Sequence, residues 1–152
     1  MAINLSFFKL KLVKENSARY DLQKSITSKD NLVNLCKVLE INNEAEEVLI
    51  LITVNTKNNI TGVFEVSRGS LNASIVHPRE IFKRAILNNA AGIFLIHNHP
   101  SGNSTPSRED IEITKRIKAA GELLGINLID HIIAGNSYYS FLENGILSHI
   151  KK

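Results

Sequence analysis

The stretch Gly92-Ile93-Phe94-Leu95-Ile96-His97-Asn98-His99-Pro100-Ser101-Gly102 joins an uninterrupted apolar run to a polar loop that carries two histidines. A short apolar run without alternation is typical of a strand that is buried on both faces. His97 and His99 are two residues apart, so in extended chain their side chains point to the same side of a sheet. The sequence therefore predicts a central strand with a pair of imidazoles at its carboxyl end.

The regions around this strand alternate between strand and helix patterns. A second apolar run, Val48 to Val54, predicts another buried strand, and Ile60 to Val66 predicts its return partner in a hairpin. Helices are expected from Ser28 to about Glu40, from Pro78 to about Asn89, and from Ser107 to Leu124. This order of elements predicts a layered α/β domain with a mixed β-sheet.

The remaining segments complete the expected organisation. Alternation of apolar and polar residues from Ile3 to Val13 predicts a half-buried strand, and Asn127 to Ala134 predicts another strand. Gly69 to Val76 is expected to be a loop with a short strand, and Phe141 to Leu147 a short closing helix. Residues 1–45 are expected to belong to or pack on one domain formed by residues 46–147, and residues 148–152 to form a tail.

Composition sets bounds on the function. The 152 residues are 43% hydrophobic and 22% charged, with a net charge of +3. This mild charge, without a dense Lys/Arg block, gives only weak support for nucleic-acid binding. Cys36 is the single cysteine, so an intrachain disulfide is impossible, and a buried thiol in a reducing compartment is expected. With no signal-peptide pattern and no membrane-length apolar run, we expect a soluble cytoplasmic protein.

The helix expected from Ser107 to Leu124 places one acid on its inward face. Counting back at helical spacing along its apolar stripe from Ile113 leads to Asp110. A buried carboxylate is costly unless it is paired or binds a cation. An acid in the first turn also suits helix capping, so Asp110 has a structural interpretation as well. Together with the two histidines, Asp110 completes the three-ligand set of a catalytic zinc site.

Several blocks of the chain match one known family in order. His97-x-His99-Pro100-Ser101-Gly102, followed by Thr105-Pro106-Ser107-x-x-Asp110, resembles the JAMM signature of the JAB/MPN metalloproteases. The surrounding sequence resembles the RadC branch of that family over roughly Glu46 to Leu142. The further matching blocks are Ser67 to Asn72, Val76 to Glu80, Asn89 to Ala91 and Leu128 to His131.

The resemblance implies a fold and a metal site. The fold is a mixed β-sheet sandwiched by helices, similar to the architecture of cytidine deaminases. The cofactor is Zn²⁺, with His97, His99 and Asp110 as ligands and a water in the fourth position. Ser107 matches the family serine that stabilises the oxyanion, and a helix cap is its structural alternative.

The resemblance also implies a general base. The family places a glutamate at the start of the first buried strand, which is Glu47 in this sequence. Glu46 beside it and Glu65 on the return strand remain alternatives. Asp130 and His131 are expected to form a hydrogen-bonding pair in the core, although His131 is the best substitute ligand. His77 precedes a proline at a helix start and is expected to have a capping or surface role rather than a catalytic one, and His149 is expected to be inert in the tail.

The implied function is that of a zinc metallopeptidase or isopeptidase, which cleaves an amide bond with an activated water. Longer RadC proteins carry a helix-hairpin-helix region suited to DNA contact and are linked with DNA repair. Residues 1–45 lack its Gly-rich hairpins, so the chain resembles the short stand-alone members. The alternative is a DNA- or protein-binding accessory module with a structural metal pocket. A deaminase is disfavoured because a Cys-x-x-Cys pair is missing. Substrate and oligomeric state do not follow from the sequence.

Overall fold

The computed structural model describes residues 4–69 and 76–147. Within these ranges the core is a mixed five-stranded sheet in the order β2-β1-β3-β4-β5. The only parallel pair in it is β3 with β4. The strands are β1 (Val48–Val54), β2 (Ile60–Arg68), β3 (Gly92–Asn98), β4 (Asn127–Ala134) and β5 (Tyr138–Ser140).

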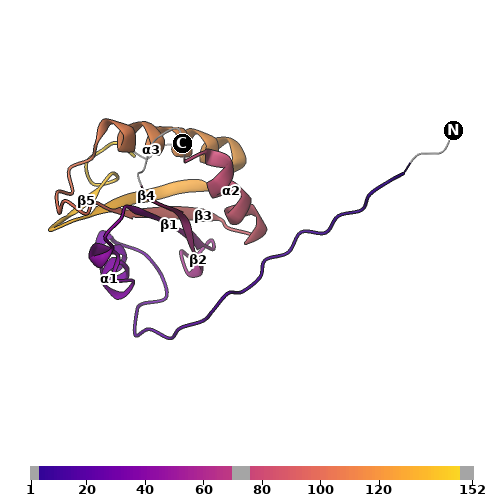
Figure 1. The fold of residues 1–152 in the computed structure, drawn as a ribbon, viewed down its shortest axis with the longest axis horizontal. Coiled ribbons are helices and arrows are strands. Elements are labelled where there is room, and N and C mark those ends of the chain that lie inside the picture. Colours follow the sequence, from indigo (N-terminus) through magenta and orange to yellow (C-terminus); the bar gives the residue numbers. More distant parts are fainter. Residues whose placement is uncertain (1–3, 70–75, 148–152) are drawn as a thin grey trace.

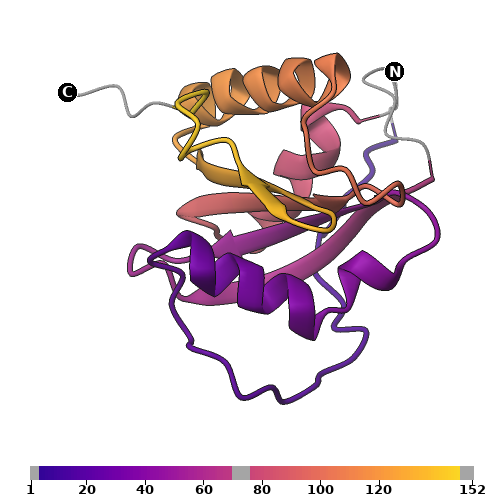
Figure 2. The ribbon, with the colours of Figure 1, turned by 90° about the vertical axis from the view of Figure 1, so that its left-hand side faces the viewer.

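Helices cover both faces of the sheet, as Figures 1 and 2 show. One face carries α1, and the opposite face carries α2 and α3. The helices are α1 (Lys29–Val38), α2 (Pro78–Leu87) and α3 (Arg108–Leu124), and a 3₁₀ turn, η1 (Ile41–Asn43), follows α1. This arrangement confirms the predicted layered fold with a mixed sheet between helices.

Each face of the sheet has its own apolar core, because successive side chains of a strand point to opposite faces. The core beneath α2 and α3 contains the odd-numbered residues of β1 and β3, namely Leu49, Leu51, Ile93 and Leu95. The core beneath α1 contains even-numbered residues of the same strands, namely Ile52, Val54, Phe94 and Ile96. In β3, odd-numbered residues therefore face α2 and α3, and even-numbered residues face α1.

The helix boundaries follow the predicted capping signals. Ser28 caps α1 and Ser107 caps α3, each through its hydroxyl oxygen. Pro78 occupies the first turn of α2, where its missing N–H costs nothing. Gly125 ends α3 with a φ of 71°, a left-handed conformation that glycine adopts without strain.

The predicted strand from Ile3 to Val13 is wrong for the part that the structure describes. Residues 4–22 have no regular secondary structure, and Figure 1 shows this segment extending away from the sheet. Phe7 and Phe8 are each 91% exposed. Alternation makes a strand only where a neighbouring edge supplies hydrogen bonds and a core, and the described part of this segment pairs with no strand and leaves apolar side chains exposed.

The end of the chain also differs from expectation. Residues 141–147 form successive turns rather than the predicted short helix. Gly145 takes a φ of 77°, which a helix does not accommodate. Residues 70–75, in the segment predicted to hold a short strand, and residues 148–152, which include His149, lie outside the described residues. The domain boundaries remain predictions.

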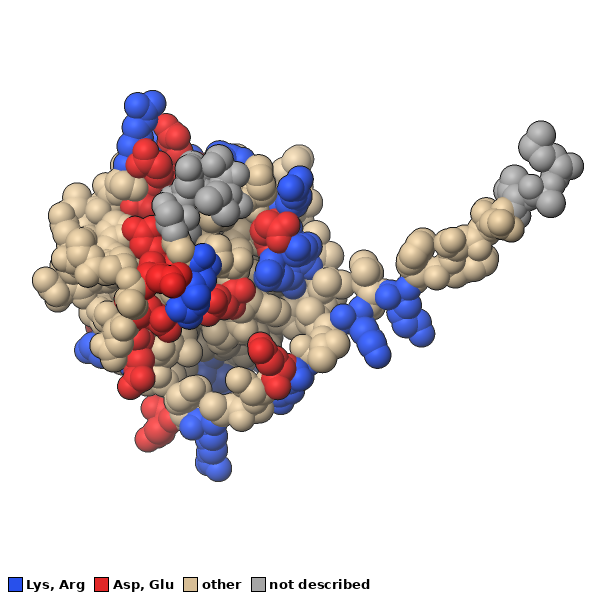
Figure 3. All heavy atoms as spheres, in the orientation of Figure 1, with Lys and Arg blue, Asp and Glu red and all other residues tan. Residues whose placement is uncertain are grey.

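The surface of the described part gives two further facts. None of the helices described is both long enough and apolar enough to cross a membrane. On the face drawn in Figure 3, acidic and basic side chains are interspersed over the globular part of the molecule.

Candidate metal centre

The two histidines lie at the carboxyl end of β3. His97 is fully buried within the strand, and the side chain of His99, just beyond its end, is 13% exposed. His97 has the same parity as Leu95, so it faces the core beneath α3. The main chain of His99 is held in place because its N–H donates to the carbonyl oxygen of Ala134 at 2.8 Å.

Asp110 reaches the same place from the first turn of α3. The Ser107 hydroxyl accepts a hydrogen bond from the Asp110 N–H at 3.1 Å, and Asp110 Oδ2 accepts one from the Ser107 N–H at 2.7 Å. This reciprocal cap fixes the carboxylate in its rotamer. Asp110 is only 3% exposed, which confirms its predicted inward position. The capping role and the inward placement are therefore compatible.

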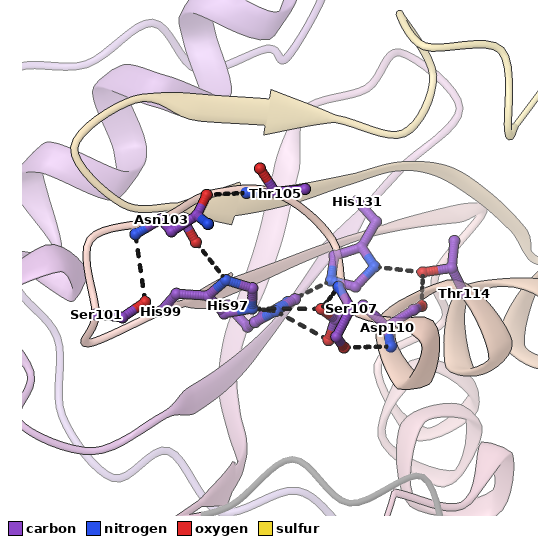
Figure 4. A network of polar contacts seen from close by, with 9 residues as sticks. All are labelled: His97, His99, Ser101, Asn103, Thr105, Ser107, Asp110, Thr114 and His131. Carbon is purple, nitrogen blue, oxygen red and sulfur yellow. Dashed lines mark hydrogen bonds and ion pairs between the residues drawn. The ribbon is translucent and has the colours of Figure 1, made fainter.

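The three side chains converge on one point, as Figure 4 shows. His97 Nε2 lies 3.0 Å from His99 Nε2 and 3.2 Å from Asp110 Oδ1. His99 Nε2 lies 3.3 Å from Asp110 Oδ2. One ligand atom from each residue falls within 4.8 Å of the others, a spacing that a single metal ion can bridge. The structure thus brings together the three predicted ligands.

The orientation of His99 provides a test of whether these atoms suit a metal. His99 Nδ1 lies 2.6 Å from the carbonyl oxygen of Asn103, and a carbonyl can only accept, so Nδ1 carries the hydrogen. A neutral His99 then presents a bare Nε2 to the Asp110 carboxylate. Two acceptors at 3.3 Å repel unless a cation lies between them. The donor set therefore fits a metal ion. A proton bound between the two atoms is the only other positive charge that would remove the repulsion.

The electrostatics of the centre are consistent with a negative carboxylate. Burial alone would raise the pKa of Asp110. The pKa nevertheless lies well below its usual range, because His97 offers a hydrogen bond and a positive charge to the carboxylate, and the Ser107 hydroxyl and N–H add hydrogen bonds. Burial, reinforced by repulsion from His97, lowers the pKa of His131 well below its ordinary value, so this imidazole is neutral at pH 7.

The first residues of β1 lie beside the end of β3 that carries the histidines. Leu49 is the register partner of His97, so β1 begins where β3 ends. The Asn98 side chain accepts from the Val48 N–H at 2.7 Å and donates to the carbonyl oxygen of Glu46 at 2.9 Å. These hydrogen bonds hold the segment that contains Glu46 and Glu47 against the strand that contains His97.

Strand register separates the three candidate glutamates. Glu47 lies just before β1, and continuing the alternation back by two residues from Leu49 predicts it on the face of His97. Glu46 has the opposite parity and is exposed. Glu65 pairs with Ile50, also on the opposite face, and its carboxylate binds Arg68 at 2.9 Å. The register therefore favours Glu47 as the acid on the metal-facing side.

The other singled-out residues take structural positions. His77 precedes α2 without a side-chain capping bond. Asp130 Oδ1 accepts from the main-chain N–H of His131 at 2.7 Å, so these residues are in contact but not through both side chains. Cys36 lies on the buried face of α1, and burial raises the pKa of its thiol to about 12.

Three contributors to the centre were not foreseen from the sequence. Asn98 fastens β1, the Asn103 carbonyl orients His99, and Thr114 bonds His131 at 2.7 Å. Of the three, only Thr114 could have been expected from the sequence, because it lies one helical turn after Asp110 on the same face of α3.

Comparison with known proteins agrees with this architecture. A family model described as the RadC-like JAB domain matches residues 26–146. The UPF0758 protein of Clostridium beijerinckii is 53% identical over 123 residues, which cover 80% of this chain and 53% of that protein. The UPF0758 protein of Trichlorobacter lovleyi is 51% identical over 109 residues, which cover 71% of this chain and 47% of that protein.

The chain spans about half the length of the curated relatives it matches. The family match nonetheless includes every strand and helix of the sheet and its two covering layers, together with the converging His97, His99 and Asp110. On these grounds the chain belongs to the RadC-like JAB domain family.

Proposed function

We propose that this chain is a zinc-dependent hydrolase that cleaves an amide bond in a peptide or isopeptide. The observation that supports it most is the convergence of His97 Nε2, His99 Nε2 and an Asp110 oxygen at the carboxyl end of β3. Membership of the RadC-like JAB domain family supports the same proposal.

The donor set favours zinc over the hard cations. Calcium and magnesium prefer oxygen ligands, whereas two imidazoles with one carboxylate suit a divalent transition metal, and zinc above all. Three protein ligands leave a position open, as catalytic sites do. When bound, zinc supplies a positive charge that polarises a carbonyl group and lowers the pKa of a coordinated water to ~7.

The chain itself supplies a base and a hydrogen-bond donor. Glu47, on the same face as His97, would accept a proton from the attacking water and pass it to the leaving amine nitrogen. The Ser107 hydroxyl accepts from the Asp110 N–H, so its own hydrogen is available to donate to a developing oxyanion. Capping and catalysis would then use different parts of the same hydroxyl group.

The decisive experiment compares two neighbouring acids. Full-length protein loaded with zinc is assayed on peptide and isopeptide libraries, beside the Glu47→Gln and Glu46→Gln variants. We expect Glu47→Gln to keep its zinc and lose roughly 10²–10⁴-fold in rate, the usual contribution of a general base. Glu46→Gln, on the opposite face, should cleave at the wild-type rate.

The competing function is an accessory module for DNA or protein in which the metal serves structure only. That function predicts zinc-loaded protein that cleaves none of the substrates, and this result would overturn the hydrolase proposal. Equal cleavage by the two glutamine variants would overturn the role of Glu47 as the base. Salt-dependent DNA binding that survives Glu47→Gln would then identify the module.

A further inference from the structure

His97 has a second contact, on the side away from the proposed ligand atoms. Its Nδ1 lies 2.8 Å from His131 Nε2, and His131 Nδ1 lies 2.7 Å from Thr114 Oγ1. Thr114 Oγ1 lies 2.6 Å from the main-chain carbonyl oxygen of Asp110. All four residues are buried. The contacts thus start at the main chain of Asp110 and return through His97 to its carboxylate, as Figure 4 shows.

The position of each hydrogen in this circuit follows from donor and acceptor chemistry. The Asp110 carbonyl can only accept, so a contact of 2.6 Å commits the Thr114 hydroxyl hydrogen to it. Thr114 Oγ1 must then accept from His131 Nδ1–H. His131 is buried, and its two ring nitrogens contact a hydroxyl and an imidazole rather than a carboxylate, so it carries this one ring hydrogen only. Its Nε2 is therefore bare and accepts from His97 Nδ1–H.

The last step concerns the ligand atom itself. With a hydrogen held on Nδ1, His97 turns its Nε2 toward His99 Nε2 at 3.0 Å and Asp110 Oδ1 at 3.2 Å, where a cation, either a metal ion or a proton, can bind. This is the tautomer that a metal requires. His131 is held in orientation by stacking on Phe141, with ring centroids 4.8 Å apart and planes 10° apart.

We propose that Thr114 and His131 are positioning residues that select the metal-binding tautomer of His97. The chain of hydrogen bonds starts at the Asp110 carbonyl in α3. Residue Asp110 therefore supplies one proposed ligand through its side chain and helps to orient another, His97, through its main chain. This inference rests on the proposed metal site, but the hydrogen that it places on His97 Nδ1 is present without metal and is measured without it.

The test uses a nearly isosteric pair of substitutions. Thr114→Val removes the hydroxyl, whereas Thr114→Ser keeps it. In Thr114→Val the His131 Nδ1–H has no acceptor, so the hydrogen moves to Nε2 and donates to His97 Nδ1. His97 must then carry its hydrogen on Nε2, where it blocks the ligand position.

Two measurements on the full chain read this change. Long-range ¹⁵N–¹H spectra of metal-free protein should show a hydrogen on His97 Nδ1 in wild type and Thr114→Ser, and a bare His97 Nδ1 in Thr114→Val. Competition titration with a chromophoric chelator should show zinc binding weakened about 10–100-fold in Thr114→Val, the usual effect of losing an outer hydrogen-bond partner. Thr114→Ser should bind as wild type does.

A double substitution separates orientation from simple damage to the fold. His131→Phe keeps an aromatic ring against Phe141 but removes the acceptor, and it should weaken zinc binding as much as Thr114→Val. The combined variant should show no further loss, because Thr114 acts only through His131. Additive losses would overturn the proposal and indicate two independent packing defects.

The outcomes also distinguish this inference from the proposed function. Wild-type protein that binds no zinc overturns the metal site, whatever the spectra show. Wild-type protein that binds zinc, with equal affinity in Thr114→Val and an unchanged His97 tautomer, overturns the positioning role alone. If Thr114→Val does not fold, as judged by circular dichroism, His131→Phe against wild type supplies the same comparison.

Discussion

The side-chain oxygen of Asn98 accepts a hydrogen bond from the main-chain N–H of Val48 at 2.7 Å. Asn98 is the last residue of β3 and Val48 the first of β1. The bond therefore ties the end of the histidine-bearing strand to the start of the strand that follows Glu47. Its amide nitrogen extends the tie by donating to the carbonyl oxygen of Glu46 at 2.9 Å.

Loss of this tie should reduce both stability and catalysis. Asn98→Ala leaves the buried Val48 N–H without its acceptor, which should cost about 1–3 kcal/mol in the free energy of unfolding. Asn98→Asp keeps an acceptor but sets a carboxylate against the Glu46 carbonyl, so it should not restore stability. Urea denaturation measures the first effect, and turnover by zinc-loaded protein measures the second. Wild-type turnover in Asn98→Ala would show that Glu47 needs no such anchor.

Zinc binding should depend on one acid of the first turn of α3 and not on its neighbour. Asp110→Asn removes a negative ligand, so zinc affinity should fall by more than the ~10–100-fold typical of outer partners. Glu109→Gln changes an exposed side chain in the same turn and is the matched control. Metal content after gel filtration and calorimetric titration are the measurements. Equal zinc retention by the two variants would contradict the ligand assignment.

The loop after the histidines is packed tightly against the turn between β4 and β5. A Cβ added at Gly135 would clash with the carbonyl oxygen of Gly102 and lie 3.0 Å from the main-chain nitrogen of Ser104. Gly135→Ala must therefore displace the loop that holds Asn103, whose carbonyl orients His99. We expect a loss of about 1–3 kcal/mol in stability and, through the lost contact to His99, about tenfold or more in zinc affinity.

Gly125 provides the control for that substitution. It has a φ of 71° and no atom within 4 Å of an added Cβ. Gly125→Ala should therefore cost about 1–2 kcal/mol through backbone strain alone and leave zinc affinity unchanged. Thermal unfolding and zinc titration on both variants would separate the two effects. A drop in zinc affinity for Gly125→Ala would mean that affinity merely follows stability.

Acid should remove the contribution of Asp110 to the stability of metal-free protein. Its pKa is lowered in the folded state from an ordinary value of 3.8, so the ionised carboxylate stabilises the fold above that pH. The stability difference between wild type and Asp110→Asn should be full at about pH 5 and shrink as the pH falls below ordinary carboxyl values. Urea unfolding at a series of pH values measures it. A difference that stays constant to pH ~2 would contradict the shifted pKa.

Local patterns were sufficient for most elements of the sheet and helices. The apolar runs at Val48–Val54 and 92–96 became β1 and, with His97 and Asn98 added, β3, and the Ser107 cap began α3 as predicted. Helical spacing alone placed Asp110 inward. These predictions succeeded because hydrophobic periodicity and capping depend on residues within one or two turns of each other.

The same reasoning failed where a distant partner decides the outcome. The alternation of residues 3–13 lacks a partner edge in the described part, so it does not become a strand there. Asn98 has the parity of the opposite face, and the sequence does not say that β1 would begin beside it. Strand pairing is a long-range choice, because hydrogen bonds between strands are set by which edges meet.

The sequence by itself determined the two imidazoles at a strand end, the inward carboxylate of Asp110 and the family to which these residues point. Only the tertiary structure decided that β1 lies antiparallel beside β3, with Leu49 opposite His97, which favours Glu47 over Glu46 as the proposed base. It also decided that Thr114, His131 and Asn103 fix the two ring orientations. The physical reason is that composition and spacing set local conformation, whereas hydrogen-bond donors and acceptors find their partners only once the layers have packed.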